Sequence, residues 1–253
     1  MDEASPPPTN SGVTVLRLEG LSVFLPSHNE EGNVERVVAA FNAALPRVTD
    51  DYEIIVVDDG SRDRTGQIAD RLAASDPHVR VIHHEQNRGY GGAVISGITA
   101  ATKPWLLLCD GDGQFDAVDV QALAAYAGEF DLIVGHRAHR ADHLGRRLNG
   151  SAWTALMRLL FGIRARDVDC GFKLFRRELI NPGELRARGA MISAELMARM
   201  AGQGARIREV DVHHLPRPTG AQSGANLKVV MRAFRELFAL YGELRAQARR
   251  RRK

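Results

Sequence analysis

Residues 52–61, YEIIVVDDGS, decide the fold class of this 253-residue chain. The run from Tyr52 to Val57 is almost continuously apolar, which is the pattern of a strand buried on both faces of a parallel sheet. Asp58 and Asp59 follow this run at once. Ligands of an open α/β sheet bind beyond the carboxyl ends of its strands, so these two carboxylates are candidates for a binding site.

Strands and helices alternate on both sides of this stretch. Short apolar runs predict further strands at residues 21–26, 79–83, 105–109 and 131–135. Apolar residues at helical spacing, or the glycine loop that opens the segment, predict helices at 30–45, 63–74, 89–101 and 116–127. The resulting βαβαβαβαβ order predicts the α/β class, with an open, mostly parallel sheet flanked by helices.

The second half is less regular and is interpreted as an elaboration of the same domain. Its expected elements are helices at 148–161 and 192–201, strands at 171–176 and 206–213, and a long amphipathic helix from 226 to about 249. We therefore divide the chain into a disordered leader (1–19), one domain (20–225) and a C-terminal amphipathic helix with a basic tail (226–253). The tail's cations are either a solvated helix end or a segment attracted to an anionic membrane.

Composition excludes several classes of protein. Hydrophobic residues make up 44% of the chain and charged residues 26%, which excludes a fully disordered or fibrous chain. Two cysteines exclude a disulfide scaffold and favour a reducing compartment. The net charge of +3 is too small to indicate nucleic-acid binding, and an aromatic content of 6% gives no platform on which bases could stack. No nucleic-acid partner is therefore expected. We also expect neither a signal peptide nor a membrane-spanning helix.

The stretch 109–114, CDGDGQ, is the strongest chemical signal. Asp110 and Asp112 provide two hard oxygen ligands within reach of one cation, and Gln114 can add a carbonyl oxygen. Mg²⁺ binds one or two carboxylates together with substrate phosphates, and the intervening glycines leave room for those phosphates. A calcium-binding EF-hand is excluded because Gln121 stands where that loop needs Glu. The alternative is a turn that holds no metal.

Two other polar clusters follow predicted strands. PSHNEE, residues 26–31, is either part of a binding site or a helix start capped by Asn29. RPTGAQSG, residues 217–224, is either a mobile linker or a loop whose Arg217 closes on phosphate, because a guanidinium matches phosphate oxygens in a fork. The adjacent pairs at 83–84 and 213–214 are histidines without metal-ligand spacing, and we expect them to be ordinary strand residues.

Taken in order, PSHNEE, VVDDGS, NRGYGGA, CDGDGQF, DCGFKLFRRE and HLPRPTGAQSG resemble the family 2 glycosyltransferases of the dolichol-phosphate mannose synthase type. The resemblance covers residues 20–245. It implies a GT-A fold, a nucleotide-sugar donor, Mg²⁺ or Mn²⁺ as cofactor, and inversion at the anomeric carbon. It also implies a polyprenyl-phosphate acceptor.

The resemblance implies a role for each matching position. Donor-binding roles fall on Pro26, His28, Glu30, Asp58, Asp59 and Asp110. The metal ligands would be Asp110, Asp112 and Gln114. The residues assigned to catalysis would be Asp112, Arg217 and Glu195. Arg217 would reach the phosphates across the closed site.

The acceptor side is assigned from the same resemblance. Arg137 and Arg147 lie where the family binds the acceptor phosphate, with Arg140 and Arg146 as competitors for that role. Glu195 lies where relatives that use a hydroxyl acceptor have a catalytic carboxylate, so here it is either a base or a structural anchor. Asp169 is a further acidic candidate on this side. An acceptor phosphate is already anionic at neutral pH, so a strong base is not required.

Some features depart from the family's usual pattern. Many relatives carry C-terminal membrane-spanning helices, whereas residues 226–248 are amphipathic and rich in arginine. We therefore expect an enzyme peripheral to the cytoplasmic face of the membrane. The Q-x-x-R-W motif of processive synthases is absent, which predicts transfer of a single sugar. A soluble or secondary-metabolite acceptor and an inactive nucleotide-sugar-binding scaffold are the alternatives. The sequence distinguishes neither GDP-mannose from a UDP-hexose nor one oligomeric state from another.

Overall fold

The computed structural model describes residues 17–138, 155–163, 165–217 and 236–246. A seven-stranded sheet forms its centre, in the order β3-β2-β1-β4-β6-β5-β7. The strands are β1 (Leu21–Ser27), β2 (Tyr52–Asp58), β3 (Val79–His83), β4 (Trp105–Cys109), β5 (Leu132–His136), β6 (Phe172–Arg176) and β7 (Ile207–Asp211). Only β6 runs antiparallel to its neighbours among these strands, so the predicted mostly parallel sheet is confirmed.

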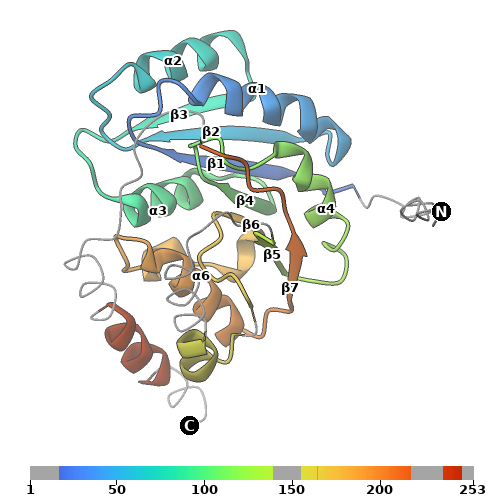
Figure 1. Ribbon diagram of the computed structural model, residues 1–253, viewed down its shortest axis with the longest axis vertical. Helices are drawn as coiled ribbons and strands as arrows, with labels where there is room; N and C mark the ends of the chain where they lie inside the picture. The colour runs from blue at the N-terminus through green and yellow to red at the C-terminus, as the bar shows by residue number, and fades with distance from the viewer. Residues whose placement is uncertain (1–16, 139–154, 164, 218–235, 247–253) are drawn as a thin grey trace, which may run out of the picture.

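Helices cover both faces of the sheet. They are α1 (Val34–Ala44), α2 (Thr65–Ser75), α3 (Tyr90–Ala100), α4 (Val120–Ala124) and α6 (Met191–Gly202), and residues 155–161 and 236–246 are also helical. The 3₁₀ turns are Leu45–Arg47, Ala117–Asp119, Arg177–Leu179 and Pro182–Glu184. Helices α1 and α2 lie over one face of the sheet, and α3 lies over the other (Figure 1).

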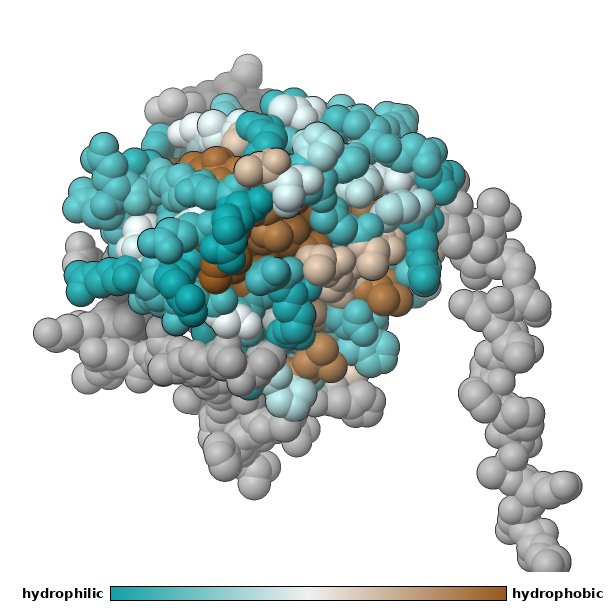
Figure 2. Space-filling model, turned by 90° about the horizontal axis from the view of Figure 1, so that it is seen from above, coloured by the Kyte–Doolittle hydropathy of each residue, from teal (hydrophilic) through white to brown (hydrophobic). Residues whose placement is uncertain are grey.

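The core forms where these layers meet. Phe24 of β1 is fully buried, and its ring packs edge-on against Phe175 of β6 at 6.4 Å. On the α3 side, a Cβ atom at Gly97 would lie 2.5 Å from the Phe24 ring, so α3 packs directly on β1 at a position where a side chain has no room. The face seen in Figure 2 is mainly hydrophilic, with hydrophobic side chains confined to a few places. Among the described residues, no helix combines the length and apolar character needed to cross a membrane.

Two predicted helices differ from the structure. The helix expected from residue 30 begins at Val34, because residues 30–33 form a turn in which the Asn33 amide donates to the Glu30 carbonyl. Asn29 has a φ of +57° and does not cap this helix, so that expectation is wrong. The helix expected over 116–127 is a 3₁₀ turn followed by the short α4, and its last turns again close with 3₁₀-type hydrogen bonds.

Several expectations lie partly outside the described residues. Of the predicted leader 1–19, only residues 17–19 are described. The helices predicted at 148–161 and from 226 to about 249 are described over 155–161 and 236–246, and both of these parts are helical.

Candidate active site

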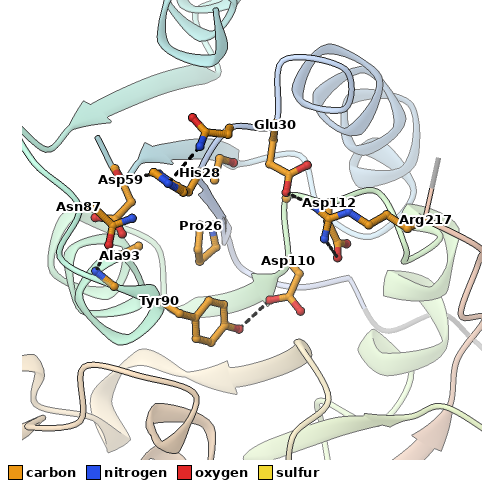
Figure 3. A pocket seen from close by; sticks show the side chains of 14 residues that line it. Pro26, His28, Glu30, Asp59, Asn87, Tyr90, Ala93, Asp110, Asp112 and Arg217 are labelled. Carbon is orange, nitrogen blue, oxygen red and sulfur yellow. Dashed lines mark hydrogen bonds and ion pairs between the residues drawn. The ribbon is translucent and has the colours of Figure 1, made fainter. Parts of the chain in front are cut away.

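The sheet order reverses between β1 and β4, and a cavity of about 670 Å³ opens at this point. The carboxyl ends of both strands and the start of α3 line it (Figure 3). Several of the predicted site residues meet on its wall: Pro26, His28, Glu30, Asp59, Asp110, Asp112 and Arg217. Strand ends that are far apart in sequence therefore converge on one site, as expected for a parallel sheet.

A close backbone approach fixes the two carboxylates after β4. The Gly111 amide donates to the Pro26 carbonyl at 3.2 Å. A Cβ atom at Gly111 would lie 2.9 Å from that same oxygen and closer still to the Ser27 hydroxyl. Only glycine fits here without a shift, and the fit places Asp110 and Asp112 beside the end of β1.

The Oδ1 atom of each of these carboxylates is held by a protein donor. The Tyr90 hydroxyl donates to Asp110 Oδ1 at 2.6 Å, and the Gln114 amide donates to Asp112 Oδ1 at 3.1 Å. Burial, followed by the charge of Asp112, raises the pKa of Asp110 to about 6. Two neighbouring carboxylates in a partly buried site repel each other, so the binding of a cation is favoured.

Arg217 lies next to this acidic pair. Its guanidinium donates to Glu30 Oε1 at 2.5 Å and to Asp112 Oδ2 at 3.4 Å. Burial raises the pKa of Glu30, although hydrogen bonds from Asn33 and Arg217 oppose this effect. The side chain of Arg217 is only 18% exposed, so the arginine belongs to the wall of the cavity. The rest of the predicted loop, residues 218–224, lies outside the described residues.

The donor set of this pair fits a hard divalent cation. Asp110 and Asp112 both face the cavity, and carboxylate oxygens are the ligands that Mg²⁺ and Mn²⁺ prefer. Within the described ranges, no group of three or more His, Cys, Asp or Glu side chains could hold a metal. A cation here would therefore take its remaining ligands from water or a diphosphate. Gln114 does not line the cavity, and its side-chain NH2 group donates to the Leu215 carbonyl at 3.2 Å, so a ligand role for its carbonyl oxygen stays a prediction.

A second cavity of about 490 Å³ lies beside the first, and His28 lines both. Asp58 lines only this second cavity, where it accepts the Ser61 amide at 3.0 Å and the His83 ring at 3.0 Å. Hydrogen bonds to Asp70, and then to Asp58, raise the pKa of His83.

Asp59 is held in a similar way but in the interior. It accepts the His84 ring at 2.6 Å and the Arg88 amide at 2.8 Å, and it is 3% exposed. Each member of the adjacent carboxylate pair thus has its own histidine. From the sequence alone, these histidines are expected to be ordinary strand residues. Their role becomes visible only through the register that pairs Asp58 with His83 across β2 and β3.

Tyr90 and Asn87 are further site residues without a role predicted from the sequence. Both line the first cavity, and both come from the NRGYGGA loop that the resemblance includes. The motif itself was the signal, because Asn87 stands just before α3 and Tyr90 is the first residue of this helix.

The predicted acceptor side is only partly described. Arg137 forms a two-pronged ion pair with Asp167, at 2.7 and 2.8 Å. Burial lowers the pKa of Arg137, but its hydrogen bonds to Asp167 outweigh this and raise it overall. Arg137 is not among the residues that line either of the two cavities. Arg147 and its competitors at 140 and 146 lie outside the described residues, and Asp169 is exposed.

Glu195 lies in α6, away from both cavities, and is 1% exposed. Its carboxylate accepts the Arg186 amide at 3.0 Å, the Ala187 amide at 2.8 Å and Arg199 Nε at 2.9 Å. Of the two roles considered for this residue, these contacts favour the structural anchor.

Comparison with known proteins identifies a matching family and several relatives. The model of the family described as Glycosyl transferase family 2 matches residues 22–182. The polyprenol monophosphomannose synthase of Mycolicibacterium smegmatis is 30% identical over 238 residues, which cover 86% of each chain. The undecaprenyl-phosphate 4-deoxy-4-formamido-L-arabinose transferase of Pectobacterium atrosepticum is 29% identical over 84% of this chain. The match covers 65% of that relative, so the chain spans less than two thirds of its length.

Solved structures show the same fold. The glucosyl-3-phosphoglycerate synthase of Mycobacterium tuberculosis in complex with phosphoglyceric acid superposes with a TM-score of 0.62, at 23% identity over 89% of this chain and 80% of that one. The same synthase has been solved with Mn²⁺ and uridine-diphosphate-glucose, again with a TM-score of 0.62, at 22% identity over 89% of this chain and 79% of that one. These likenesses confirm the predicted GT-A-like architecture.

Proposed function

The chain belongs to glycosyltransferase family 2, and we propose that it transfers one sugar from a nucleotide-sugar donor to a polyprenyl phosphate. The observation that carries the proposal is the single cavity in which Asp59, Asp110, Asp112 and Arg217 meet. The names of the relatives from Mycolicibacterium and Pectobacterium support the polyprenyl-phosphate acceptor.

The donor would lie across the two adjoining cavities. We assign its base and ribose to the second cavity and its neighbourhood, where Asp58 and Asp59 present carboxylates that accept N–H and O–H groups. His28 lines both cavities and would lie between the nucleoside and the reacting end, with Pro26 on the side of the first cavity. Both aspartates are held by histidines and backbone amides, so their oxygens are oriented before a ligand arrives.

Asp110 and Asp112 would hold the proposed Mg²⁺ or Mn²⁺, which, when bound, offsets charge on the leaving diphosphate. Arg217 already lies 3.4 Å from Asp112, so it is in place to donate to the phosphates on the same side. Glu30 orients this arginine from behind.

The chemistry then needs little from a base. An acceptor phosphate oxygen attacks the anomeric carbon, and the bond from that carbon to the diphosphate oxygen breaks on the opposite face, which inverts the configuration. The nucleophile is anionic at neutral pH, so no proton has to leave it. The cavity's contribution is alignment of the two reactants and stabilisation of the departing charge by Arg217.

We also propose that the protein docks on the cytoplasmic face of a membrane. Leu159 and Phe238 are 80% and 62% exposed, and they lie on the helical segments 155–161 and 236–246. The Phe161 and Tyr241 rings join these two segments at 6.0 Å. Exposed apolar side chains near arginines suit an anionic bilayer surface.

Vesicle sedimentation tests the docking proposal. The Phe238→Asp variant should bind phosphatidylglycerol vesicles several-fold more weakly than the wild type. Val118→Asp is the matched control, because Val118 is also half exposed but lies in a distant 3₁₀ turn. Equal binding by all three proteins would contradict docking through segment 236–246.

Nucleoside-diphosphate release tests the activity. GDP- and UDP-sugars would each be incubated with Mn²⁺ or Mg²⁺, with and without a polyprenyl phosphate, and Asp112→Ala is the control. Release that requires lipid, metal and Asp112 supports the proposal and identifies the donor. Donor-specific release that ignores lipid indicates a soluble acceptor, and metal-dependent nucleotide binding without any release favours an inactive scaffold.

A further inference from the structure

The glycine loop that opens α3 lies directly against segment 186–189. The Gly91 amide donates to the Arg188 carbonyl at 3.0 Å. A Cβ atom at Gly89 would lie 2.6 Å from that oxygen, and one at Gly91 would overlap the Ala187 carbonyl and lie 2.8 Å from the Arg188 carbonyl carbon. The two backbones therefore touch, so the position of segment 186–189 determines the position of the loop.

This loop is part of the donor cavity. Gly89 and Tyr90 both line it, and the Tyr90 hydroxyl holds Asp110 at 2.6 Å. Gly89 has a φ of +81°, a left-handed conformation that glycine adopts readily. A displacement of the loop would therefore move a wall of the cavity. It would also move the Tyr90 hydroxyl, whose hydrogen bond orients Asp110.

Glu195 holds the other side of this contact. Its carboxylate accepts the amides of Arg186 and Ala187, at 3.0 and 2.8 Å, immediately before Arg188. Arg199 Nε donates to it at 2.9 Å, and a second nitrogen of Arg199 reaches Glu243 at 3.1 Å. A buried carboxylate is tolerated when donors satisfy its oxygens, and three donors of the chain itself do so here.

We propose that Glu195 is a positioning residue for the nucleotide-sugar pocket, acting through segment 186–189 on the glycine loop. It does not act as the base that its sequence position suggests. The inference rests on the proposed function, because it assumes that the cavity binds a nucleotide. Its consequence is that loss of the Glu195 charge weakens donor binding instead of removing a proton-transfer step.

Nucleotide binding separates the two roles of Glu195. Titration calorimetry with GDP and with UDP, each in Mn²⁺, should show at least about tenfold weaker binding to Glu195→Gln. In this variant an NH2 group replaces one carboxylate oxygen, so an N–H group that the oxygen accepted now faces another N–H group. The KM for the donor should rise while kcat at saturating donor changes little, and the pH profile of kcat should keep its shape. Loss of a base would instead lower kcat by about 10² or more and leave nucleotide affinity intact.

A second pair of variants tests the path without touching Glu195. Gly91→Ala should weaken nucleotide binding as Glu195→Gln does, because its Cβ forces the loop off segment 186–189. Gly189→Ala is the matched control, since a Cβ at Gly189 meets nothing within 4 Å. Where Glu195→Gln fails to fold, wild-type nucleotide affinity in Gly91→Ala still overturns the inference, because the loop would then not depend on its contact with segment 186–189.

The outcomes are distinct. Weaker nucleotide binding by both Gly91→Ala and a folded Glu195→Gln, with Gly189→Ala unchanged, supports the inference. Wild-type affinity in a folded Glu195→Gln, or in Gly91→Ala, overturns it while the proposed function stands. A wild-type chain that binds neither nucleotide overturns the proposed function and this inference with it.

Discussion

Replacing Gly111 by alanine tests whether the close contact between the end of β1 and the DGDG loop sets the geometry of the site. The new Cβ would lie 2.9 Å from the Pro26 carbonyl oxygen, and closer to the Ser27 hydroxyl. Ser27 can rotate its hydroxyl, but the Pro26 carbonyl belongs to the backbone of β1, where Pro26 pairs with Val57 of β2, so it yields much less. The loop that carries Asp110 and Asp112 must therefore move instead.

The size of this movement follows from the contact. An ordinary contact begins at 3.4 Å, so the loop moves by about 0.5 Å from its 2.9 Å position. Overpacking of this kind costs about 1–3 kcal/mol, and the lower entropy of the unfolded alanine chain returns about 0.4–1 kcal/mol. The net loss of about 1–2 kcal/mol lowers Tm by roughly 2–8 °C. A misplacement of 1 Å can cost about 10² in rate, so half of it should lower kcat/KM about tenfold.

Calorimetry and nucleoside-diphosphate release measure the two effects. Gly202→Ala is the control, because its Cβ at the end of α6 meets nothing within 4 Å and should leave activity unchanged. The Ser27→Ala/Gly111→Ala double variant should recover part of the Tm but not the full activity, since the contact with Pro26 remains. A Gly111→Ala protein with wild-type Tm and kcat/KM would show that the loop position does not control the chemistry.

Two further predictions concern the hydrogen bonds that orient the carboxylates. Tyr90→Phe removes the 2.6 Å donor from Asp110 and should weaken Mn²⁺ binding about tenfold in electron paramagnetic resonance titrations without nucleotide, and unchanged affinity would contradict this role. Hydrogen bonds to Asp70 and Asp58 raise the pKa of His83 above 6.5, so this contact stabilises the fold fully below about pH 6.5, and its contribution is lost as the pH rises through the raised pKa. Asp70→Asn should therefore lower the urea unfolding free energy by only about 0.2–0.5 kcal/mol at pH 5.5, because the pair is exposed, and by nothing at pH 9; an equal loss at both pH values would refute the assignment.

The sequence predicted the sheet well because its strands are local signals. Strands β3 and β4 coincide with residues 79–83 and 105–109, since in each case an apolar run is bounded by polar or turn residues. Helix ends were harder, because they depend on tertiary contacts. The predicted start at residue 30 failed since the Glu30 amide donates to the Thr65 hydroxyl, which holds the chain in a turn until Asn33.

The site residues differ in the same way, because some could be predicted from local sequence and others depend on tertiary contacts. Asp59 and Asp110 meet in one cavity because each directly follows a parallel strand, and Asp112 comes two residues after Asp110; position along a strand can be predicted from sequence. Glu195 could not be assigned in the same way. Its role depends on which segment faces α6, and no local pattern records that the amides of residues 186 and 187 point at its carboxylate.

The balance of charge in the first cavity ties the proposed parts together. Its wall carries the carboxylates of Glu30, Asp59, Asp110 and Asp112 but, among the described residues that line it, one guanidinium, that of Arg217. Such a wall repels a diphosphate unless more positive charge enters with it. Arg217 is itself paired with Glu30 and Asp112, so it can turn to a phosphate only as another cation takes over at Asp112. The proposed metal and Arg217 would therefore act together. The acidic wall would bind the metal, and Arg217 would then be free to contact the donor.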